Sequence, residues 1–206
     1  MLRIFKTLTK PARNCRVVTV GAEELAKLAG ERADNLFIAH GLSCSEAVLV
    51  VLDRGFGGGL GVEMALGIGS GFGGGIGGAG CVCGALSGAV AALGLFLGAG
   101  RYPGYDKKEF RLLVAGMHDR FRERSASTCC RQLLADFRGK RSERKYFCGD
   151  LTRWSANEAA RIILVKRPEL SAVVEYDYLN GRDSRFDALA DRLFKGRLLA
   201  GSEKKD

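Results

Sequence analysis

The sequence predicts an all-α protein, a compact helical bundle with a buried glycine-rich loop and at most a short terminal β-hairpin. Apolar residues recur at helical spacing in several long segments, four of which begin at a capping pattern or end at a helix stop. Signals for strands are few. With 206 residues, 47% of them hydrophobic and 27% charged, the chain can bury a substantial core and lacks the composition of a disordered protein.

The first two predicted helices lie before residue 55. Two acidic residues suit the first turn of a helix over Ala22–His40, which Gly41 ends. Ser43 and Glu46 then form the reciprocal capping pattern of a second helix, whose apolar run is Ala47–Leu52.

The segment Gly55–Gly100 differs in composition from the rest of the chain. It holds 19 of the 29 glycines and a single charged residue, Glu63. Within it, Gly71–Gly80 is too rich in glycine for a helix interior and predicts a loop, packed against the cysteine site described below. Cys83–Leu97 predicts a buried helix of small residues.

A membrane span over Cys81–Gly100 is the competing interpretation, because these twenty residues are uncharged. We expect no span, because glycine is abundant, an aromatic belt is missing and the sequence has no second candidate.

The second half of the chain predicts further helices joined by a basic linker. The expected elements are a helix opened by Asp106 and Glu109 that runs to Arg124, a short helix Cys129–Phe137, a basic linker Arg138–Lys145, a helix opened by Ser155 and Glu158 and ended by Pro168, a strand Ala172–Leu179 paired with Cys15–Val20, and an amphipathic helix Ser184–Leu199. We therefore divide the chain into a basic N-terminal arm (1–21), a cysteine-rich helical redox domain (22–168) and a C-terminal extension (169–206).

The charge and the cysteine count indicate a compartment and a kind of partner. The net charge is +9, and the first twenty residues carry five basic side chains and no acidic one, which favours anionic partners such as an acidic redox protein. The N-terminus lacks the apolar stretch of a secretory signal, so we expect a cytoplasmic protein. In a reducing compartment, seven dispersed cysteines indicate metal binding or redox chemistry more than disulfides.

Four of the cysteines share one predicted context, the start of a helix. Cys44 follows the cap Ser43, Cys83 opens a helix, Cys130 begins a short helix, and Cys148 is expected in a turn before a helix. Free N–H groups at a helix start lower the pKa of a thiol and stabilise the thiolate, which binds metals and attacks disulfides. We therefore predict that these four cysteines converge on one site and that Cys15 lies apart from it.

The glycine loop supplies a second argument for a bulky cofactor. Gly73 and Gly74 let the backbone approach closely and direct N–H groups at the sulfur atoms of a metal cluster. The interpretation of the glycines as a phosphate-binding loop has weaker support, because no clear strand precedes them and no Lys-Ser or Lys-Thr pair follows them.

The order of these motifs resembles the C_GCAxxG_C_C family of putative redox-active proteins. The resemblance covers roughly residues 23–167 and rests on these segments in order: Cys44-Ser45-Glu46-Ala47-Val48, Gly71-Phe72-Gly73-Gly74-Gly75, Cys83-Gly84-Ala85-Leu86-Ser87-Gly88, Cys130-Arg131-Gln132-Leu133-Leu134 and a last Cys148. The same region is similar to the cysteine-rich part of split-Soret cytochrome c, which implies an iron–sulfur cluster bound by Cys44, Cys83, Cys130 and Cys148. Cys81 and Cys129 are additional to the family pattern and are candidates to replace a ligand.

Other functions stay open at this point. A thiol redox protein without a metal needs two neighbouring cysteines, for which Cys81 with Cys83, or Cys83 with Cys148, are candidates. Structural zinc is disfavoured, because its ligands arrive in close pairs, and a Cys–His centre with His40 or His118 has weaker support. Nucleic-acid binding through Arg138–Lys145 lacks interleaved aromatic residues, so we expect no nucleic-acid partner.

The sequence identifies no catalytic residue. It leaves open whether the chain is an oxidoreductase component and whether it forms a homodimer.

Overall fold

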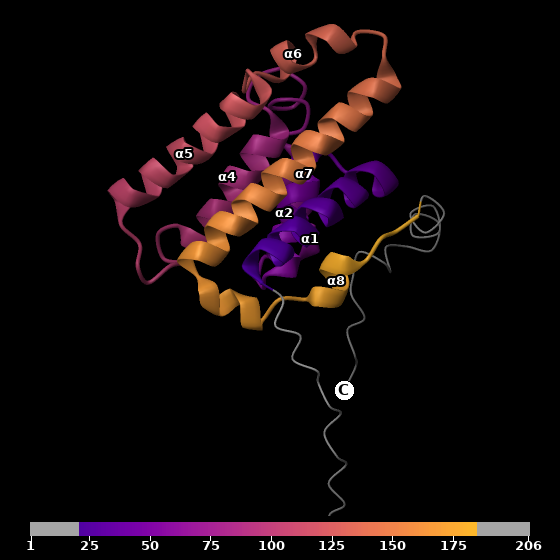
Figure 1. The fold of residues 1–206 in the computed structure, drawn as a ribbon. Helices are drawn as coiled ribbons and strands as arrows, with labels where there is room; N and C mark the ends of the chain where they lie inside the picture. Colours follow the sequence, from indigo (N-terminus) through magenta and orange to yellow (C-terminus); the bar gives the residue numbers. More distant parts are fainter. Residues whose placement is uncertain (1–20, 185–206) are drawn as a thin grey trace, which may run out of the picture.

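Residues 21–184 are described by a computed structural model, in which this part of the chain consists of helices and loops with one isolated β-bridge (Figure 1). The predicted all-α class is therefore confirmed. The α-helices are α1 (Ala22–Asn35), α2 (Cys44–Gly55), α3 (Val62–Ser70), α4 (Gly84–Leu97), α5 (Lys107–Ser125), α6 (Cys130–Leu133), α7 (Arg141–Lys166) and α8 (Tyr176–Asn180). A π-helix spans Leu36–His40, and 3-10 helices span Ala135–Phe137 and Pro168–Ala172.

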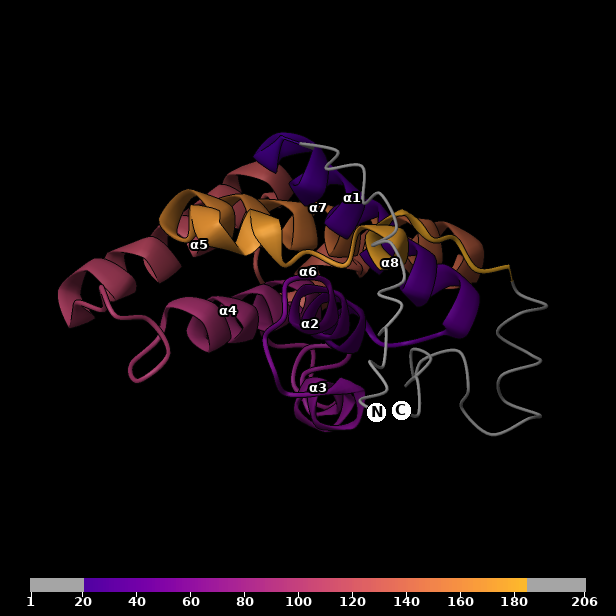
Figure 2. The same ribbon diagram turned by 90° about the horizontal axis from the view of Figure 1, so that it is seen from below.

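The helices stack in layers around α2. Helix α1 packs along α7, the longest helix, and α2 contacts α3, α4 and α7. Figure 2 shows α1 and α7 on one side of α2 and α3 on the opposite side. At one end of the bundle, α6 lies close to the first turns of α7 and to the glycine loop that precedes α4 (Figure 1).

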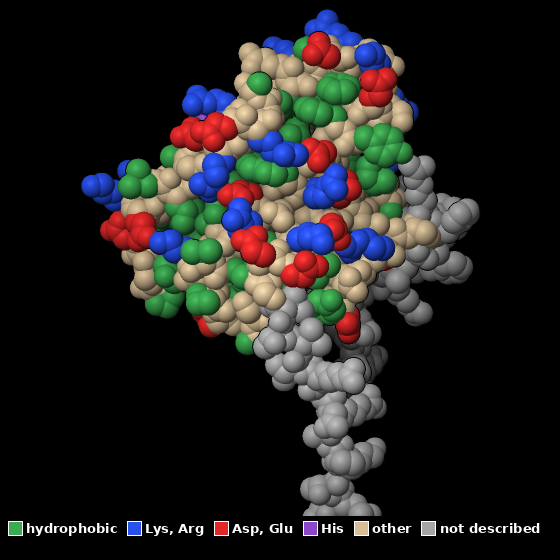
Figure 3. All heavy atoms as spheres, viewed as in Figure 1, with side chains coloured by type: hydrophobic (Ala, Val, Ile, Leu, Met, Phe, Trp, Pro, Cys, Tyr) green, Lys and Arg blue, Asp and Glu red, His purple; other side chains and the backbone are tan. Residues whose placement is uncertain are grey.

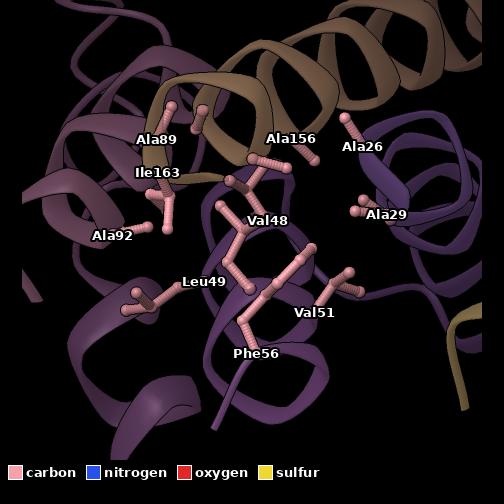
Figure 4. Packing of buried hydrophobic residues seen from close by; sticks show 14 of the residues in the cluster. Ala26, Ala29, Val48, Leu49, Val51, Phe56, Ala89, Ala92, Ala156 and Ile163 are labelled. Atoms are coloured by element: carbon pink, nitrogen blue, oxygen red, sulfur yellow. The ribbon is translucent and has the colours of Figure 1, made fainter. Parts of the chain in front are cut away.

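Small and branched residues form the core between these helices (Figure 4). The most buried include Ala26 and Ala29 of α1, Val48 and Val51 of α2, Phe56 directly after α2, Ala89 and Ala92 of α4, and Ala156 and Ile163 of α7, each no more than 1% exposed. Small side chains at the contacts let the helix axes come close together, and burial of this apolar surface stabilises the bundle.

The predicted starts of α2 and α5 are confirmed by their hydrogen bonds. Ser43 Oγ accepts a hydrogen bond from the Glu46 N–H (3.3 Å), and Glu46 Oε2 accepts one from the Ser43 N–H (2.6 Å). Asp106 Oδ1 caps α5 by accepting from the Glu109 N–H at 2.7 Å. The end of the first helix at Gly41 is also correct, because Gly41 has a left-handed φ of 71° that most other residues avoid.

Two predictions about α7 are wrong. The helix does not begin at Ser155 but runs unbroken from Arg141 to Lys166, so most of the supposed linker Arg138–Lys145 is its first turn. Ser155 lies fully buried within the helix, and its hydroxyl has no hydrogen-bond partner. A Ser-x-x-Glu pattern marks a start only where the chain enters a helix, and here the packing of α7 on α1 and α4 continues through it.

The glycine-rich segment also departs from expectation. The sequence does not predict helix α3, because Val62–Ser70 contains two glycines, but the segment is helical. The following loop is mostly exposed and not buried as expected, with only Gly75 enclosed. The predicted helix Cys129–Phe137 is divided into α6 and the 3-10 helix Ala135–Phe137.

The expected strand Ala172–Leu179 is wrong. Its residues end one 3-10 helix and form most of α8, where Leu179 is fully buried against α2. A Cβ atom on Gly55 would lie 2.6 Å from Leu179 Cδ2, so glycine at position 55 makes room for this side chain. The proposed pairing strand Cys15–Val20 and, apart from Ser184, the predicted helix Ser184–Leu199 lie outside the described residues, as does Cys15.

A buried charged cluster attaches the segment after α8 to α1. Asp183 Oδ2 lies 2.8 Å from both Arg32 Nη2 and His40 Nε2, and the Asp183 main chain exchanges two hydrogen bonds with the Asn35 side chain. Burial raises the pKa of Asp183, but the hydrogen bonds and charges of His40 and Arg32 outweigh it, so the pKa is lowered overall.

We expect Asp183→Asn to destabilise the protein by about 1–2 kcal/mol at neutral pH, because the charge-assisted hydrogen bonds of a partly exposed carboxylate to the buried Arg32 and His40 are lost. A lowered pKa means that the carboxylate stabilises the fold above pH 3.8 and that this contribution is lost as the pH falls through the folded-state pKa. Thermal unfolding at several pH values should therefore show the difference shrinking in acid. Asp119→Asn, at an exposed ion pair, is the control that should change little.

The surface mixes basic and acidic side chains over α1 and α7 (Figure 3). Arg161, for example, contacts both Glu23 and Glu158, and Arg120 contacts Glu158 at 2.7 Å. Over residues 21–184, every helix is too short or too polar to cross a lipid bilayer.

Candidate functional site

The structure brings the four predicted cysteines to one place. Cys44, Cys83, Cys130 and Cys148 all line a single cavity of about 600 Å³. They come from the start of α2, the start of α4, the start of α6 and the second turn of α7. Their convergence is an observation, whereas their role as ligands stays a prediction.

Backbone N–H groups point at two of the four sulfur atoms. The N–H groups of Ser45 and Gly74 hydrogen-bond the sulfur of Cys44 and lower its pKa, although burial, the larger effect, raises it. The sulfur of Cys83 likewise accepts hydrogen bonds from the N–H groups of Ala85 and Leu86, at the start of α4. The donors Ser45, Ala85 and Leu86 are free N–H groups of a helix start, whereas the Gly74 N–H comes from the glycine loop.

The predicted glycines of the loop occupy different positions. Gly74 lines the cavity and has a left-handed φ of 65°, which favours glycine. Gly73 is not among the cavity-lining residues; a Cβ on Gly73 would lie 3.1 Å from Ser43 Cβ, so it lets the loop pack on the cap of α2.

Cys148 is in a different setting from the one predicted. It lies within α7 and not in a turn, so its thiol is not next to the free N–H groups of a helix start. Burial raises the pKa of Cys148 to about 11, and the Arg144 guanidinium, which hydrogen-bonds its sulfur, acts in the opposite direction. Arg144 and Cys148 are four residues apart and therefore lie on the same face of α7.

The prediction of lowered thiol pKa values is wrong for the protein without a cofactor. Burial is the largest effect at all four positions and raises the pKa, to about 12 for Cys83. Helix-start N–H groups are too weak to offset the loss of water around a charged sulfur. A metal or cluster must therefore displace protons from these thiols when it binds.

The glycines of the Cys-Gly-Ala-x-x-Gly motif let α4 approach α2. A Cβ on Gly84 would lie 2.6 Å from Cys44 Sγ, and one on Gly88 would lie 2.8 Å from the Ser45 carbonyl oxygen. Both distances are shorter than van der Waals contact. The motif therefore places Cys83 beside Cys44, besides supplying one cysteine.

The two additional cysteines do not line the cavity. Val82 and Cys129 form an antiparallel bridge, and the residues that follow them, Cys83 and Cys130, line the cavity, whereas Cys81 and Cys129 do not. The Cys129 thiol donates a hydrogen bond to the Gly80 carbonyl at 3.1 Å, and Cys81 is exposed. Whether either can replace a ligand stays a prediction.

Sequence reasoning missed the apolar lining of the cavity, which is Phe37, Leu134, Phe137 and Leu151. Arg141, Arg144 and Lys145 also line it. Arg141, Lys145 and Cys148 are spaced four and three residues apart, a pattern that marks one helix face once α7 is known to begin at Arg141. The supposed linker therefore forms part of the site.

Within residues 21–184, no three histidine, cysteine, aspartate or glutamate side chains are grouped closely enough to hold one metal ion. The four thiols are distributed around the cavity wall.

The fold and the cavity define the class of this protein: it is an all-α, cysteine-rich protein in which four dispersed cysteines line one cavity. Residues 42–162, more than half of the chain, match the family described as "Putative redox-active protein (C_GCAxxG_C_C)", and the chain belongs to this family. Its role is accordingly a redox role. A search of curated proteins and a search of solved structures each returned no match.

Proposed function

We propose that the protein is an electron-transfer component that binds an iron–sulfur cluster through Cys44, Cys83, Cys130 and Cys148. The observation that carries the proposal is that these four cysteines, from four separate segments, line one cavity of about 600 Å³. When bound, the cluster supplies one-electron transfer.

The donor set suits a polynuclear cluster better than a single ion. The thiols surround a cavity larger than one ion needs, and no three of the ligating side chains in residues 21–184 are grouped around a point. N–H groups directed at the sulfurs of Cys44 and Cys83 are the kind of contact that tunes a cluster. The basic side chains Arg141, Arg144 and Lys145 offset the negative charge of a thiolate-bound cluster.

The test is the colour and composition of the protein purified without oxygen. We expect visible absorption that bleaches on exposure to air, with iron and acid-labile sulfide in equal amounts. Protein that stays colourless after reconstitution with ferrous iron and sulfide under reducing conditions would contradict the proposal.

A thiol redox protein without a metal is the second candidate. It requires a thiolate near neutral pH, whereas burial raises the pKa of Cys83 to about 12 and that of Cys148 to about 11. The pairs Cys81 with Cys83 and Cys83 with Cys148 are therefore weak nucleophile candidates. Nucleic-acid binding is the third candidate. It has less support, because three of the five basic side chains in Arg138–Lys145 line the cavity.

We expect Arg144→Gln to lower the reduction potential of the cluster by tens of millivolts. Reduction adds negative charge, which the nearby guanidinium stabilises. Arg138→Gln is the matched control, because Arg138 is exposed and does not line the cavity. Equal potentials of the two variants in a spectroelectrochemical titration would contradict the placement of Arg144.

The proposed acidic redox partner is then recognised by the exposed charges beside the cavity. Neutralising every basic side chain of Arg138–Lys145 is expected to disturb the cluster, because three of them, Arg141, Arg144 and Lys145, line the cavity. Arg138→Gln and Lys140→Gln alone should slow association with the partner and reduce its dependence on salt.

A further inference from the structure

The exposed thiol of Cys81 lies opposite a cavity cysteine. Because Val82 pairs with Cys129 in the antiparallel bridge, Cys81 stands directly across from Cys130. The Cys130 N–H donates to the Cys81 carbonyl at 2.6 Å, and the Cys83 N–H donates to the Thr128 carbonyl at 2.8 Å. Residues directly opposite one another in such a pair project their side chains to the same face.

The backbone brings these two cysteines within reach of a disulfide. With standard bond lengths, the 2.6 Å hydrogen bond limits the separation of the two Cα atoms to about 6.5 Å. Disulfides form over Cα separations of about 4.4–6.8 Å. A Cβ on Gly75 would lie 2.7 Å from Cys130 Cβ and 2.8 Å from Cys81 N, so the Cys130 side chain begins beside the Cys81 backbone.

We infer that Cys81 and Cys130 form a thiol–disulfide exchange site, at which a small-molecule disulfide oxidises the pair and withdraws Cys130 from the cavity. The Cys81 thiolate attacks one sulfur of the small disulfide and releases one small thiol. The Cys130 thiol then gives up its proton as its sulfur attacks Cys81 Sγ, forming the protein disulfide and releasing the second small thiol. The oxidant gains two electrons and two protons, and the two cysteines lose them.

The charges around the pair favour an anionic oxidant. A second pocket, of about 240 Å³, adjoins the cavity and is lined by Arg131, Arg144, Gly80 and Cys130 among others. The Arg131 guanidinium is fixed at its edge by a 2.7 Å hydrogen bond to the Ala79 carbonyl. A disulfide that carries carboxylates, such as oxidised glutathione, matches this arrangement.

The exchange site does not depend on the iron–sulfur proposal, but its effect on the cluster does. Since Cys130 lines the cavity, its oxidation removes one of the four sulfur donors. Oxidant would then release the cluster through a cysteine that itself lies outside the cavity.

The first experiment uses the full-length protein without metal, treated with oxidised glutathione. Digestion without reductant and peptide fragmentation, which separates the adjacent Cys129 and Cys130, should map a disulfide between Cys81 and Cys130. It should be absent in Cys81→Ser and unchanged in Cys129→Ser. A bridge from Cys81 to Cys129, or a glutathione adduct on Cys81 with no internal bridge, would overturn the inference.

The second experiment uses protein that contains iron. The same oxidant should bleach wild type and Cys129→Ser at the same rate and Cys81→Ser several-fold more slowly. Equal rates in all three would overturn the coupling of the pair to the cavity. Because the disulfide map is made without metal, its failure is distinguishable from a lack of iron, which contradicts only the proposed cluster.

Discussion

Cys83→Ser is expected to lose most of its bound iron and its visible absorption. Cys83 is buried at the start of α4, where two backbone N–H groups hydrogen-bond its sulfur. A serine hydroxyl keeps the shape of the side chain but is a much poorer ligand for iron than a thiolate. The measurement is iron and sulfide content after identical anaerobic reconstitution of both proteins.

Cys129→Ser is the matched control for this experiment. Cys129 also lies beside a cavity cysteine in sequence, but its thiol donates to the Gly80 carbonyl and does not line the cavity. It should retain the iron content of wild type. Equal loss from the two variants would mean that serine substitution disturbs the fold locally, and equal retention would exclude Cys83 as a ligand.

Gly88→Ala is expected to destabilise the protein by about 1–3 kcal/mol, the cost of overpacking a tight contact. The new Cβ would lie 2.8 Å from the Ser45 carbonyl oxygen and 3.0 Å from Ser45 Cα, so α2 must move away from α4. That movement separates Cys44 from Cys83, and cofactor binding should weaken as well. Thermal unfolding, with a fall of about 2–4 °C per kcal/mol, measures the first effect.

Gly94→Ala on the same helix provides the opposite expectation. Nothing lies within 4 Å of its added Cβ, and alanine is the better helix former by about 1 kcal/mol. It should leave the melting temperature unchanged or raise it. If both alanine variants behaved alike, the close approach of α4 to α2 would not depend on Gly88.

The redox class and the fold answer different questions about this chain. Membership of the family establishes a redox role, and we propose that this role is exercised at the cavity that the four cysteines line. The raised pKa values of the thiols make cofactor binding depend on pH, because a metal must displace the protons of the thiols when it binds. Reconstitution should accordingly be more complete at pH 8.5 than at pH 6.5.

Local features of the chain could be predicted from sequence. The caps at Ser43 and Asp106 and the stop at Gly41 depend on a few neighbouring residues, so their patterns were sufficient. The choice of Cys44, Cys83, Cys130 and Cys148 as a group also came from local context and from the family resemblance. Its interpretation as four helix starts was right for three and wrong for Cys148.

By itself, the sequence determined the helical class and most helix boundaries before residue 130, because both follow from short-range chemistry. The grouping of the four cysteines also required the family resemblance. Only the tertiary structure decided that α7 continues back to Arg141, since packing on α1 and α4 stabilises a helix that the polar Arg138–Lys145 pattern does not predict. It likewise decided the protonation of the thiols, because burial depends on every neighbouring element. The position of Arg144 beside Cys148 follows once α7 is known to include both residues, and the position of Cys81 opposite Cys130 follows from a contact that no local pattern contains.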